Sequence, residues 1–537
     1  MSKKLSRLLL VVVVILQCGT MLYWASRKAY YFNDEFYTFE YAQNFNNKGD
    51  PYEYMPYSSL WQEEKWLSVK DLKTRFTVDE GESVFDRPFR KSFKLFFSRK
   101  NYMWIVNALE TVAGDRLSPT WVCIGFNIFI LAMLQFLLFY FLAGLLGLDR
   151  RSALLAVAMW GFCPFVLGFA VFCRFYAWTL FLFLIVIVLH RIMWDSDSIV
   201  KNIVLEAVSA LLIYVAYRNS ELVVFASGCL VLFFTIGLVV RKRYVQSLYY
   251  GLPLIGGGIA FLLKQKYFIN AVMHPAAFAY DHSRTIKSAY ARHTSRMLET
   301  SGSEKLNAMW EIVKEYGDSV SGSFYLLAIS AVLLVVLFFM ARKKLPRRFN
   351  GFILILASVA VAFWGFCGVF LFSETRYHSM LFLLSFIIAW WLFDRLLRRI
   401  KVRKVFYNIA LGLVAVGAVL PFFRRNVEYV YEDWKPIVES IAEYKDTKNL
   451  LVASTRFYVP YASVNLLDES NSIYSIFRKN DLFFDLPELP QSFLLWVDHD
   501  DFPRGGISRV FFRGYGIEPL ARTAFFDVYV CEKKGDR

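Results

Sequence analysis

The sequence predicts a polytopic α-helical membrane protein of about eleven transmembrane helices, with extracytoplasmic juxtamembrane helices and a small extracytoplasmic α/β domain at its C-terminal end. The first observation is composition: 57% of the 537 residues are hydrophobic and 18% are aromatic, whereas about half of a soluble domain is apolar. The second is that apolar runs recur at the length of about 20 residues needed to cross a hydrocarbon core of about 30 Å. The third is that loops rich in Lys and Arg separate alternate runs.

The predicted spans follow from the apolar runs. They cover residues 8 to 25, 120 to 146, 152 to 171, 174 to 193, 201 to 217, 221 to 240, 246 to 264, 323 to 341, 350 to 372, 378 to 393 and 405 to 423. The first run continues to Trp24 without the small-residue pattern of a signal-peptide cleavage site, so we predict a retained span.

The distribution of charge predicts the orientation of the spans. The chain has 61 Lys and Arg against 45 Asp and Glu, a net charge of +16. In a soluble domain this excess would suggest nucleic-acid binding, but in membrane proteins Lys and Arg collect in short cytoplasmic loops. With Lys3, Lys4 and Arg7 inside, the alternate loops are basic, and the loop around Asp195 and Asp197 is the weak member. We therefore predict a cytoplasmic N-terminus, an extracytoplasmic C-terminus, the lipid bilayer as a partner and no nucleic acid.

The parts outside the membrane core are long enough to have structure. Residues 1 to 423 would form the membrane domain, with a first extracytoplasmic loop at 26 to 118 and a second large loop at 266 to 322. The first loop has helical periodicity from Asn101 to Val112, which suits a helix lying in the membrane interface. Residues 424 to 537 are less hydrophobic and form the predicted α/β domain. Its expected elements are a helix at 432 to 445 and strands at 449 to 453, 493 to 497, 510 to 512 and 524 to 531.

A pair of acidic residues follows the first predicted span. Asp34 and Glu35 lie nine and ten residues after its last residue, at the predicted extracytoplasmic edge of the membrane. A carboxylate is far less costly there than at the midplane, and a lipid-borne substrate would reach water at this level. The alternative is structural, since Asp is favoured at helix N-termini and the pair could cap an interfacial helix.

Two basic and aromatic clusters fall on the same predicted side of the membrane. Arg174 and Tyr176 open the fourth span, and Arg376, Tyr377 and His378 lie where the tenth span begins. Arg and Tyr at an interface often only anchor a helix. The functional interpretation is that both arginines bind phosphate, because the guanidinium makes paired, charge-assisted hydrogen bonds. Together with a carboxylate, they suit transfer from a lipid phosphate, in which the acid removes a proton and the arginines stabilise the leaving phosphate.

These motifs resemble the GT-C class of integral-membrane glycosyltransferases, specifically the branch of protein O-mannosyltransferases and bacterial lipid A aminoarabinose transferases. The resemblance covers about residues 8 to 400 and depends on the order of four motifs. They are Asp34-Glu35 after the first span, Gly114 to Pro119 before the second, Arg174-Phe175-Tyr176 opening the fourth and Arg376-Tyr377 opening a late span. Relatives often carry a His-Pro pair in the first loop, where this chain has Arg87-Pro88.

The resemblance implies a glycosyltransferase with a polyprenyl-phosphate sugar donor, an extracytoplasmic active site and inversion at the anomeric carbon. It assigns the acidic pair to catalysis, with Asp34 closest to the role of general base, and the five residues of the two clusters to the donor phosphate. The donated group would be a hexosyl or pentosyl sugar, and the acceptor a lipid, a glycan or a protein. The sequence contains no Asn-X-Ser/Thr sequon, which favours a bacterial plasma membrane.

The sequence predicts no obligatory cofactor or metal. Some relatives in the wider class bind a divalent metal at their acids, and Glu35, Glu53 or Glu110 could contribute to such a site. However, no cluster of His and carboxylates has the spacing of metal ligands. Six of the seven cysteines lie in or beside apolar runs and only Cys531 lies in a clearly aqueous segment, so no disulfide framework is predicted.

Two other classes of function fit part of this pattern. A transporter or flippase of lipid-linked glycans would have a similar number of spans, but transporters carry ionisable groups near the midplane. Here Glu206 and His190 lie near predicted cytoplasmic ends of spans. A noncatalytic subunit that binds a partner through the C-terminal domain is the other alternative.

Overall fold

The structure is a computed structural model that describes part of the chain. The described residues are 2–28, 33–43, 66–68, 70, 78, 81–98, 100–220, 222–264, 300–321, 351–370, 375–399, 427–430, 448–452, 470–476, 489–498, 514–522 and 526–534. The chain divides into two compact units. The first comprises Met1–Met21, Asn127–Ala170 and Phe175–Asn426, and the second comprises Leu22–Phe126, Val171–Arg174 and Val427–Arg537.

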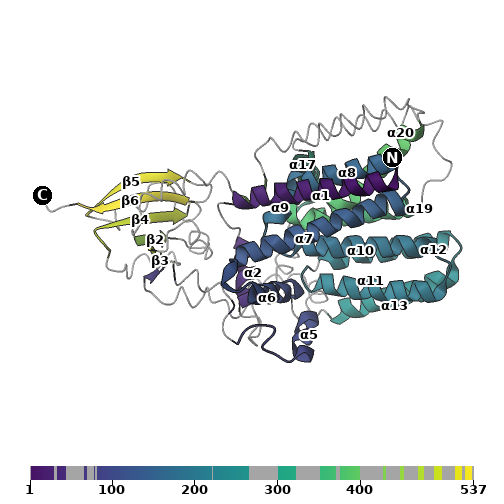
Figure 1. Cartoon of the computed structure of the whole chain (residues 1–537), viewed down its shortest axis with the longest axis horizontal. Coiled ribbons are helices and arrows are strands. Elements are labelled where there is room, and N and C mark those ends of the chain that lie inside the picture. Colours follow the sequence, from purple (N-terminus) through teal and green to yellow (C-terminus); the bar gives the residue numbers. More distant parts are fainter. Residues whose placement is uncertain are drawn as a thin grey trace. The chain divides into compact units, whose positions relative to one another are not determined.

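Seven helices in the described part of the chain are long and apolar enough to cross a membrane, which makes this a multi-pass membrane protein. Five of them are single helices: Lys3–Ser26 (α1), Tyr176–Asp195 (α10), Ile199–Tyr217 (α11), Leu222–Val240 (α12) and Gly351–Val369 (α19). The sixth, Pro119–Leu145, consists of α7 (Pro119–Phe139) and the π-helix Tyr140–Leu145. The seventh, Arg376–Arg395, lies within the 3₁₀ turn Thr375–His378 and the helix α20 (Ser379–Arg399) that follows it. Helices α10, α11, α12 and α13 (Tyr244–Lys264) pack side by side (Figure 1).

Two further apolar helices meet at a sharp bend. Helices α8 (Arg150–Phe162) and α9 (Pro164–Val171) together pass the same test and meet at an angle of 53°. Pro164 has no backbone N–H to continue the ladder of α8. The residue before it, Cys163, is extended at φ −69° and ψ 144°, which is the conformation favoured before proline. The bend therefore follows from one residue of the sequence.

The prediction of eleven spans is confirmed in part. Seven predicted spans coincide with the seven helices, and the predicted span at 152 to 171 is the bent pair α8 and α9. The predicted span at 246 to 264 is helix α13, which contains Pro253 and is not among the seven. The predicted spans at 323 to 341 and 405 to 423 lie outside the described residues.

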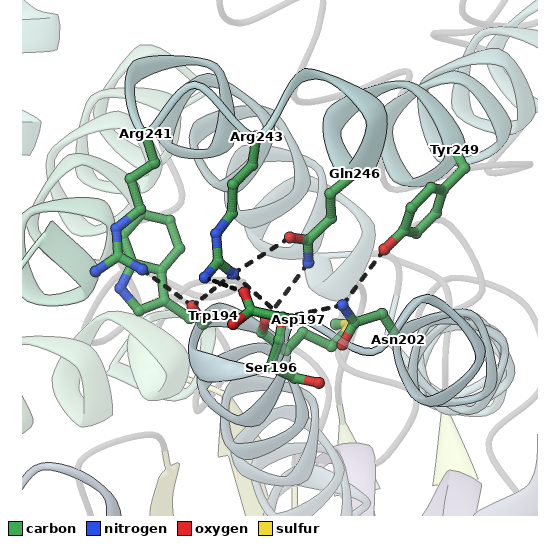
Figure 2. A network of polar contacts seen from close by, with 9 residues as sticks. Trp194, Ser196, Asp197, Asn202, Arg241, Arg243, Gln246 and Tyr249 are labelled. Atoms are coloured by element: carbon green, nitrogen blue, oxygen red, sulfur yellow. Dashed lines mark hydrogen bonds and ion pairs between the residues drawn. The ribbon is translucent and has the colours of Figure 1, made fainter.

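The basic loop between α12 and α13 caps the end of α10 (Figure 2). Arg241 Nη1 donates to the Trp194 carbonyl at 3.0 Å, and its guanidinium carbon lies 4.0 Å from the centre of the Trp194 ring. Arg243 Nη1 donates to the carbonyls of Trp194 and Ser196 at 3.3 and 3.2 Å, and its Nη2 pairs with Asp197. The last carbonyls of a helix lack intrahelical donors and carry partial negative charge, so these two cations stabilise the end of α10.

The second unit contains short helices around a buried asparagine. They are α2 (Asn33–Gln43), α5 (Phe89–Ser98) and α6 (Asn101–Ala113), followed by the 3₁₀ turn Gly114–Arg116. Asn107 of α6 is fully buried; its amide donates to the carbonyls of Ala42 at 2.6 Å and Glu82 at 3.1 Å, and its oxygen accepts from the Val84 N–H at 2.8 Å. Asn107 therefore ties α6 to the end of α2 and to the turn before α5. The helix predicted from Asn101 to Val112 is confirmed by α6.

The second unit also contains a six-stranded mixed sheet, in the order β1-β3-β2-β4-β6-β5. Its strands are β1 (Leu67–Ser68), β2 (Lys448–Val452), β3 (Ser472–Ile476), β4 (Ser492–Asp498), β5 (Tyr515–Arg522) and β6 (Phe526–Lys533), of which β2 to β6 are labelled in Figure 1. Strand β2 pairs parallel with β3 and β4, and the other pairs are antiparallel. Residues 493–497 of β4 are all buried, as expected for a strand covered on both faces.

The strand predictions hold for the hydrophobic strands. Those at 449 to 453, 493 to 497 and 524 to 531 correspond to β2, β4 and β6. The predicted helix at 432 to 445 and strand at 510 to 512 lie outside the described residues. Strands β1, β3 and β5 were not predicted. Strand β5 contains Gly516 and Pro519, which weaken a strand signal and suit its place at the edge of the sheet.

Candidate active site around Asp34 and Glu35

The acidic pair begins a short helix. Helix α2 begins at Asn33, so Asp34 and Glu35 lie in its first turn. The backbone N–H groups of a first turn lack intrahelical partners and the helix dipole is positive there, so carboxylates are stabilised. This is the position that the structural alternative predicts. The contacts of each side chain therefore distinguish a structural role from a chemical one.

Glu35 is fully buried and its two oxygens have different partners. Oε2 lies 3.0 Å from Lys28 Nζ, and the side chains of both residues are buried. Oε1 accepts a hydrogen bond from the backbone N–H of Cys173 at 2.8 Å. A buried carboxylate is tolerated when it is paired and hydrogen-bonded in this way. Glu35 therefore joins Lys28, two residues after the end of α1, to the segment just before α10.

Lys28 connects this pair to a third segment. Its ammonium donates to the backbone carbonyl of Tyr429 at 2.7 Å. Tyr429 has a positive φ of 67°, which is uncommon for a residue other than glycine. Its ring stacks on Phe172, with ring centres 3.9 Å apart and planes 5° apart. Two contacts thus hold Tyr429 in a conformation that presents its carbonyl to Lys28.

Asp34 faces a guanidinium and keeps access to solvent. Asp34 Oδ2 lies 4.0 Å from Arg174 Nη2; the Asp34 side chain is 22% exposed and the Arg174 side chain 8%. Arg174 Nη1 also donates to Thr38 Oγ1 at 3.5 Å, one turn further along α2. Arg174 therefore contacts two successive turns of α2. The arrangement provides a carboxylate that a substrate can reach beside a cation that can bind an anion.

Another set of buried polar side chains lies on α6 and close to Cys173. The carboxylate oxygens of Glu110 have no hydrogen-bond partner among the described residues, and burial raises the pKa of Glu110 to about 8. Tyr102, on the same helix, is fully buried, and burial raises the pKa of its hydroxyl well above the ordinary value. Cys123 lies close to both Tyr102 and Cys173. This set adjoins the acidic pair through Cys173, whose N–H binds Glu35.

The described residues contain no group of three or more His, Cys, Asp or Glu side chains placed to hold a metal ion. Glu53, which the sequence offered as a contributor, lies outside them. Glu35 and Glu110 are both described, and Glu35 is engaged by Lys28 and Cys173.

The remaining predicted residues belong to the first unit. Tyr176 is the first residue of α10 and is buried, with its ring stacked on Phe169 at 5.7 Å. Arg376 is buried in the 3₁₀ turn before α20; its Nη2 donates to the Tyr377 hydroxyl at 3.2 Å. His378 is fully buried, with Nδ1 3.8 Å from a carboxylate oxygen of Glu315 on helix α17 (Gly302–Ser321). The structure thus brings Asp34, Glu35 and Arg174 together in the second unit. The other four predicted residues, Tyr176, Arg376, Tyr377 and His378, belong to the first unit.

Sequence reasoning missed Lys28, Thr38 and Tyr429. Lys28 did carry a signal, because it lies on the predicted extracytoplasmic side, where the positive-inside rule does not call for a cation. A lysine seven residues before a glutamate was therefore available as its partner. No comparable signal marks Tyr429, which is about 400 residues away from Lys28 in sequence.

No protein-family model and no curated protein matches the chain. The solved structures that are similar to it include two of ArnT and one of AftD. ArnT from Cupriavidus metallidurans bound to undecaprenyl phosphate is 13% identical with a TM-score of 0.46, and ArnT in the apo state is 12% identical with a TM-score of 0.45; each comparison covers 97% of both chains. The arabinofuranosyltransferase AftD from Mycobacteria is 12% identical with a TM-score of 0.37, over 100% of this chain and 40% of AftD.

ArnT is a lipid A aminoarabinose transferase of the GT-C class, which is the branch that the four sequence motifs resemble. At identities of 12 and 13% and TM-scores below 0.5, no residue of this chain takes its role from these structures. The roles of its residues are inferred from contacts within this chain.

Proposed function

We propose that this chain is a glycosyltransferase that moves a sugar from a polyprenyl-phosphate donor to an acceptor at the extracytoplasmic face of the membrane. The observation that carries the proposal is the partly exposed Asp34 carboxylate 4.0 Å from the buried guanidinium of Arg174. A general base must be reachable by the substrate. Asp34 meets this condition, whereas Glu35 is fully buried and held by Lys28 and Cys173.

In the proposed reaction the acceptor oxygen or nitrogen attacks the anomeric carbon of the donor. Asp34 removes the proton from the acceptor as the new bond forms, and the bond between the anomeric carbon and the phosphate oxygen breaks with inversion. The polyprenyl phosphate leaves with the bonding electrons. Arg174 offsets the charge that grows on the phosphate, because a guanidinium makes charge-assisted hydrogen bonds to phosphate oxygens.

Glu35 then has a positioning role in place of a direct one. It holds the backbone at Cys173, and the next residue along the chain is Arg174. Lys28 neutralises Glu35 and also binds Tyr429, so the position of Arg174 beside Asp34 depends on three segments of the second unit. Removing any of these contacts would alter the placement of the guanidinium without removing the base.

Tyr176, Arg376, Tyr377 and His378 keep the donor-phosphate role expected from the sequence as part of this proposal. The hydrogen bond from Arg376 to the Tyr377 hydroxyl supports it, because it orients a buried guanidinium. We also propose a bacterial plasma membrane, a cytoplasmic N-terminus and an extracytoplasmic C-terminal domain at residues 424 to 537. The acceptor is a lipid, a glycan or a protein, and the sugar a hexose or a pentose.

The experiment that tests this proposal measures the lipid product. The purified full-length chain is reconstituted in liposomes with an extract of bacterial membrane lipids that contains polyprenyl-phosphate sugars and acceptors, and free polyprenyl phosphate is quantified by mass spectrometry. The proposal predicts release of polyprenyl phosphate that depends on the protein. A flippase would move the glycolipid between leaflets and leave it intact. Transbilayer movement without release would therefore replace this proposal with the transporter alternative.

A further inference from the structure

Helix α5 carries an aromatic surface that the proposed reaction does not use. Phe89, Phe93, Phe96 and Phe97 fall within an arc of about 100° when a helix turns by about 100° per residue. Phe89 is 77% exposed and Phe93 is 47% exposed. The rings of Phe89 and Phe93 stack with centres 5.5 Å apart, and Phe93 and Phe97 meet edge to face at 5.0 Å. We call these four residues the aromatic surface of α5.

Cations lie beside this surface. Arg90, Lys91 and Lys94 are exposed, and α5 has no acidic residue. By the same rotation of about 100° per residue, Arg90 and Lys94 border the aromatic surface and Lys91 lies on the opposite side of the helix. Exposed aromatic side chains therefore lie next to exposed cationic side chains around the axis of α5.

The remaining side of α5, apart from the aromatic and cationic sides, packs on α6. This packing determines which part of α5 is exposed. Ser92 is buried and its Oγ accepts a hydrogen bond from Trp104 Nε1 at 3.0 Å. The Phe96 ring meets the Trp104 ring edge to face, with centres 5.5 Å apart. These contacts fix the rotation of α5 about its own axis. Phe89 and Phe93 consequently stay exposed although they are apolar.

We propose that α5 lies on the bilayer and binds anionic phospholipid, with the aromatic surface at the acyl-chain boundary and Arg90 and Lys94 at the lipid phosphates. An exposed cluster of large apolar side chains marks an interaction site. A helix with aromatic residues on one side and Lys and Arg on the other is the form that lies in a membrane interface. Each cation near an anionic surface adds to the affinity. An acidic protein would satisfy the cations, but lipid is the partner that also covers the aromatic surface in a membrane-embedded chain.

Photo-crosslinking in the full-length protein tests this proposal. The variant Phe89→p-benzoylphenylalanine is reconstituted in vesicles of phosphatidylcholine alone or mixed with phosphatidylglycerol, and adducts are identified by mass spectrometry. We expect lipid adducts at position 89, enriched in phosphatidylglycerol over its share of the vesicle. Lys91→p-benzoylphenylalanine, on the opposite side of the same helix, is the matched control and should give few. Adducts with protein only, or equal lipid adducts at positions 89 and 91, would overturn the proposal.

A second arm tests the charge. Arg90→Gln combined with Lys94→Gln, in the Phe89 crosslinking variant, should lower the enrichment of phosphatidylglycerol severalfold, and added salt should lower it in the parent variant because salt screens exposed charges. Lys533→Gln combined with Lys534→Gln removes two exposed cations at the end of β6 and should leave the enrichment unchanged. Unchanged enrichment in the Arg90 and Lys94 variant would exclude anionic recognition by α5. Gel filtration and thermal unfolding of each variant verify that it is folded.

Discussion

Lys28 Nζ lies 3.0 Å from Glu35 Oε2, and both side chains are almost completely removed from solvent. Glu35 also accepts the N–H of Cys173, and Lys28 also donates to the carbonyl of Tyr429. The pair therefore connects three segments that are remote in sequence. Because Arg174 follows Cys173, the same pair determines what faces Asp34.

Breaking this pair from one side should be costly. Lys28→Met leaves the Glu35 carboxylate buried without its cation, and we expect a loss of about 3 to 5 kcal/mol in the free energy of unfolding. Lys28→Met combined with Glu35→Gln removes both charges and should recover part of that loss. Denaturant unfolding of the two single variants and the double variant measures the coupling. Strictly additive effects would mean that the two residues do not act as a pair.

The positive φ of Tyr429 predicts an order of stability among variants at this position. The left-handed conformation costs about 1 to 2 kcal/mol for a residue with a Cβ, and a β-branched residue tolerates it least. We expect Tyr429→Phe, which keeps the stack on Phe172, to resemble wild type in thermal unfolding. Tyr429→Gly should lose the stack but relieve the backbone, and Tyr429→Val should lose most. A Val variant as stable as the Phe variant would contradict this conformation.

Glu110 should make stability depend on pH. Its pKa of about 8 in the folded protein lies above the ordinary 4.5, so between these pH values the folded state holds a proton that the unfolded state has released. Its contribution to stability is therefore complete below about pH 4.5 and is lost as the pH rises to about 8, at up to about 1.4 kcal/mol per pH unit. Glu110→Gln should flatten the fall in unfolding free energy measured from pH 5 to 8. Equal slopes in wild type and variant would show that Glu110 keeps an ordinary pKa.

Arg174 should act on the affinity for the lipid phosphate. Loss of a hydrogen bond to a charged group costs about 1.5 to 3 kcal/mol, so Arg174→Ala should weaken binding of undecaprenyl phosphate about tenfold to a hundredfold. Arg174→Lys keeps the charge but lacks the planar guanidinium, so its affinity should lie between those of wild type and Arg174→Ala. Titration of the purified variants with undecaprenyl phosphate measures this. The control Arg522→Ala removes an arginine that pairs with Asp527 in the sheet, and its affinity for undecaprenyl phosphate should match that of wild type. Equal affinities in wild type and all three variants would mean that Arg174 only anchors the helix.

The spans and the hydrophobic strands could be predicted because each depends on a local run of apolar residues. Helix α10 and strand β4 are examples, since both are buried along most of their length. The contacts of the candidate site could not be predicted in the same way. Glu35 is bound by a backbone N–H at Cys173, and a backbone donor has no signature in the sequence. Tyr429 contributes a carbonyl and a ring from the far end of the chain.

Strand β1 shows the same limit in the sheet. It has only two residues, Leu67 and Ser68, and it pairs with β3 from the C-terminal part of the chain. A two-residue strand is too short for alternation to reveal it. The acidic pair itself was recognisable, but the division of roles between Asp34 and Glu35 depends on burial, which neighbouring residues in sequence do not determine.

The replacement of Asp34 by Asn tests the central claim most directly, with release of polyprenyl phosphate in liposomes as the measured rate. A general base contributes about 100-fold to 10,000-fold, so Asp34→Asn should lower the rate by at least about 100-fold while undecaprenyl phosphate still binds. Asp527→Asn is the matched control, because Asp527 is 21% exposed and pairs with Arg522 at 3.5 Å; its rate should equal that of wild type. An Asp34→Asn rate within a fewfold of wild type would contradict the assignment of Asp34 as the base.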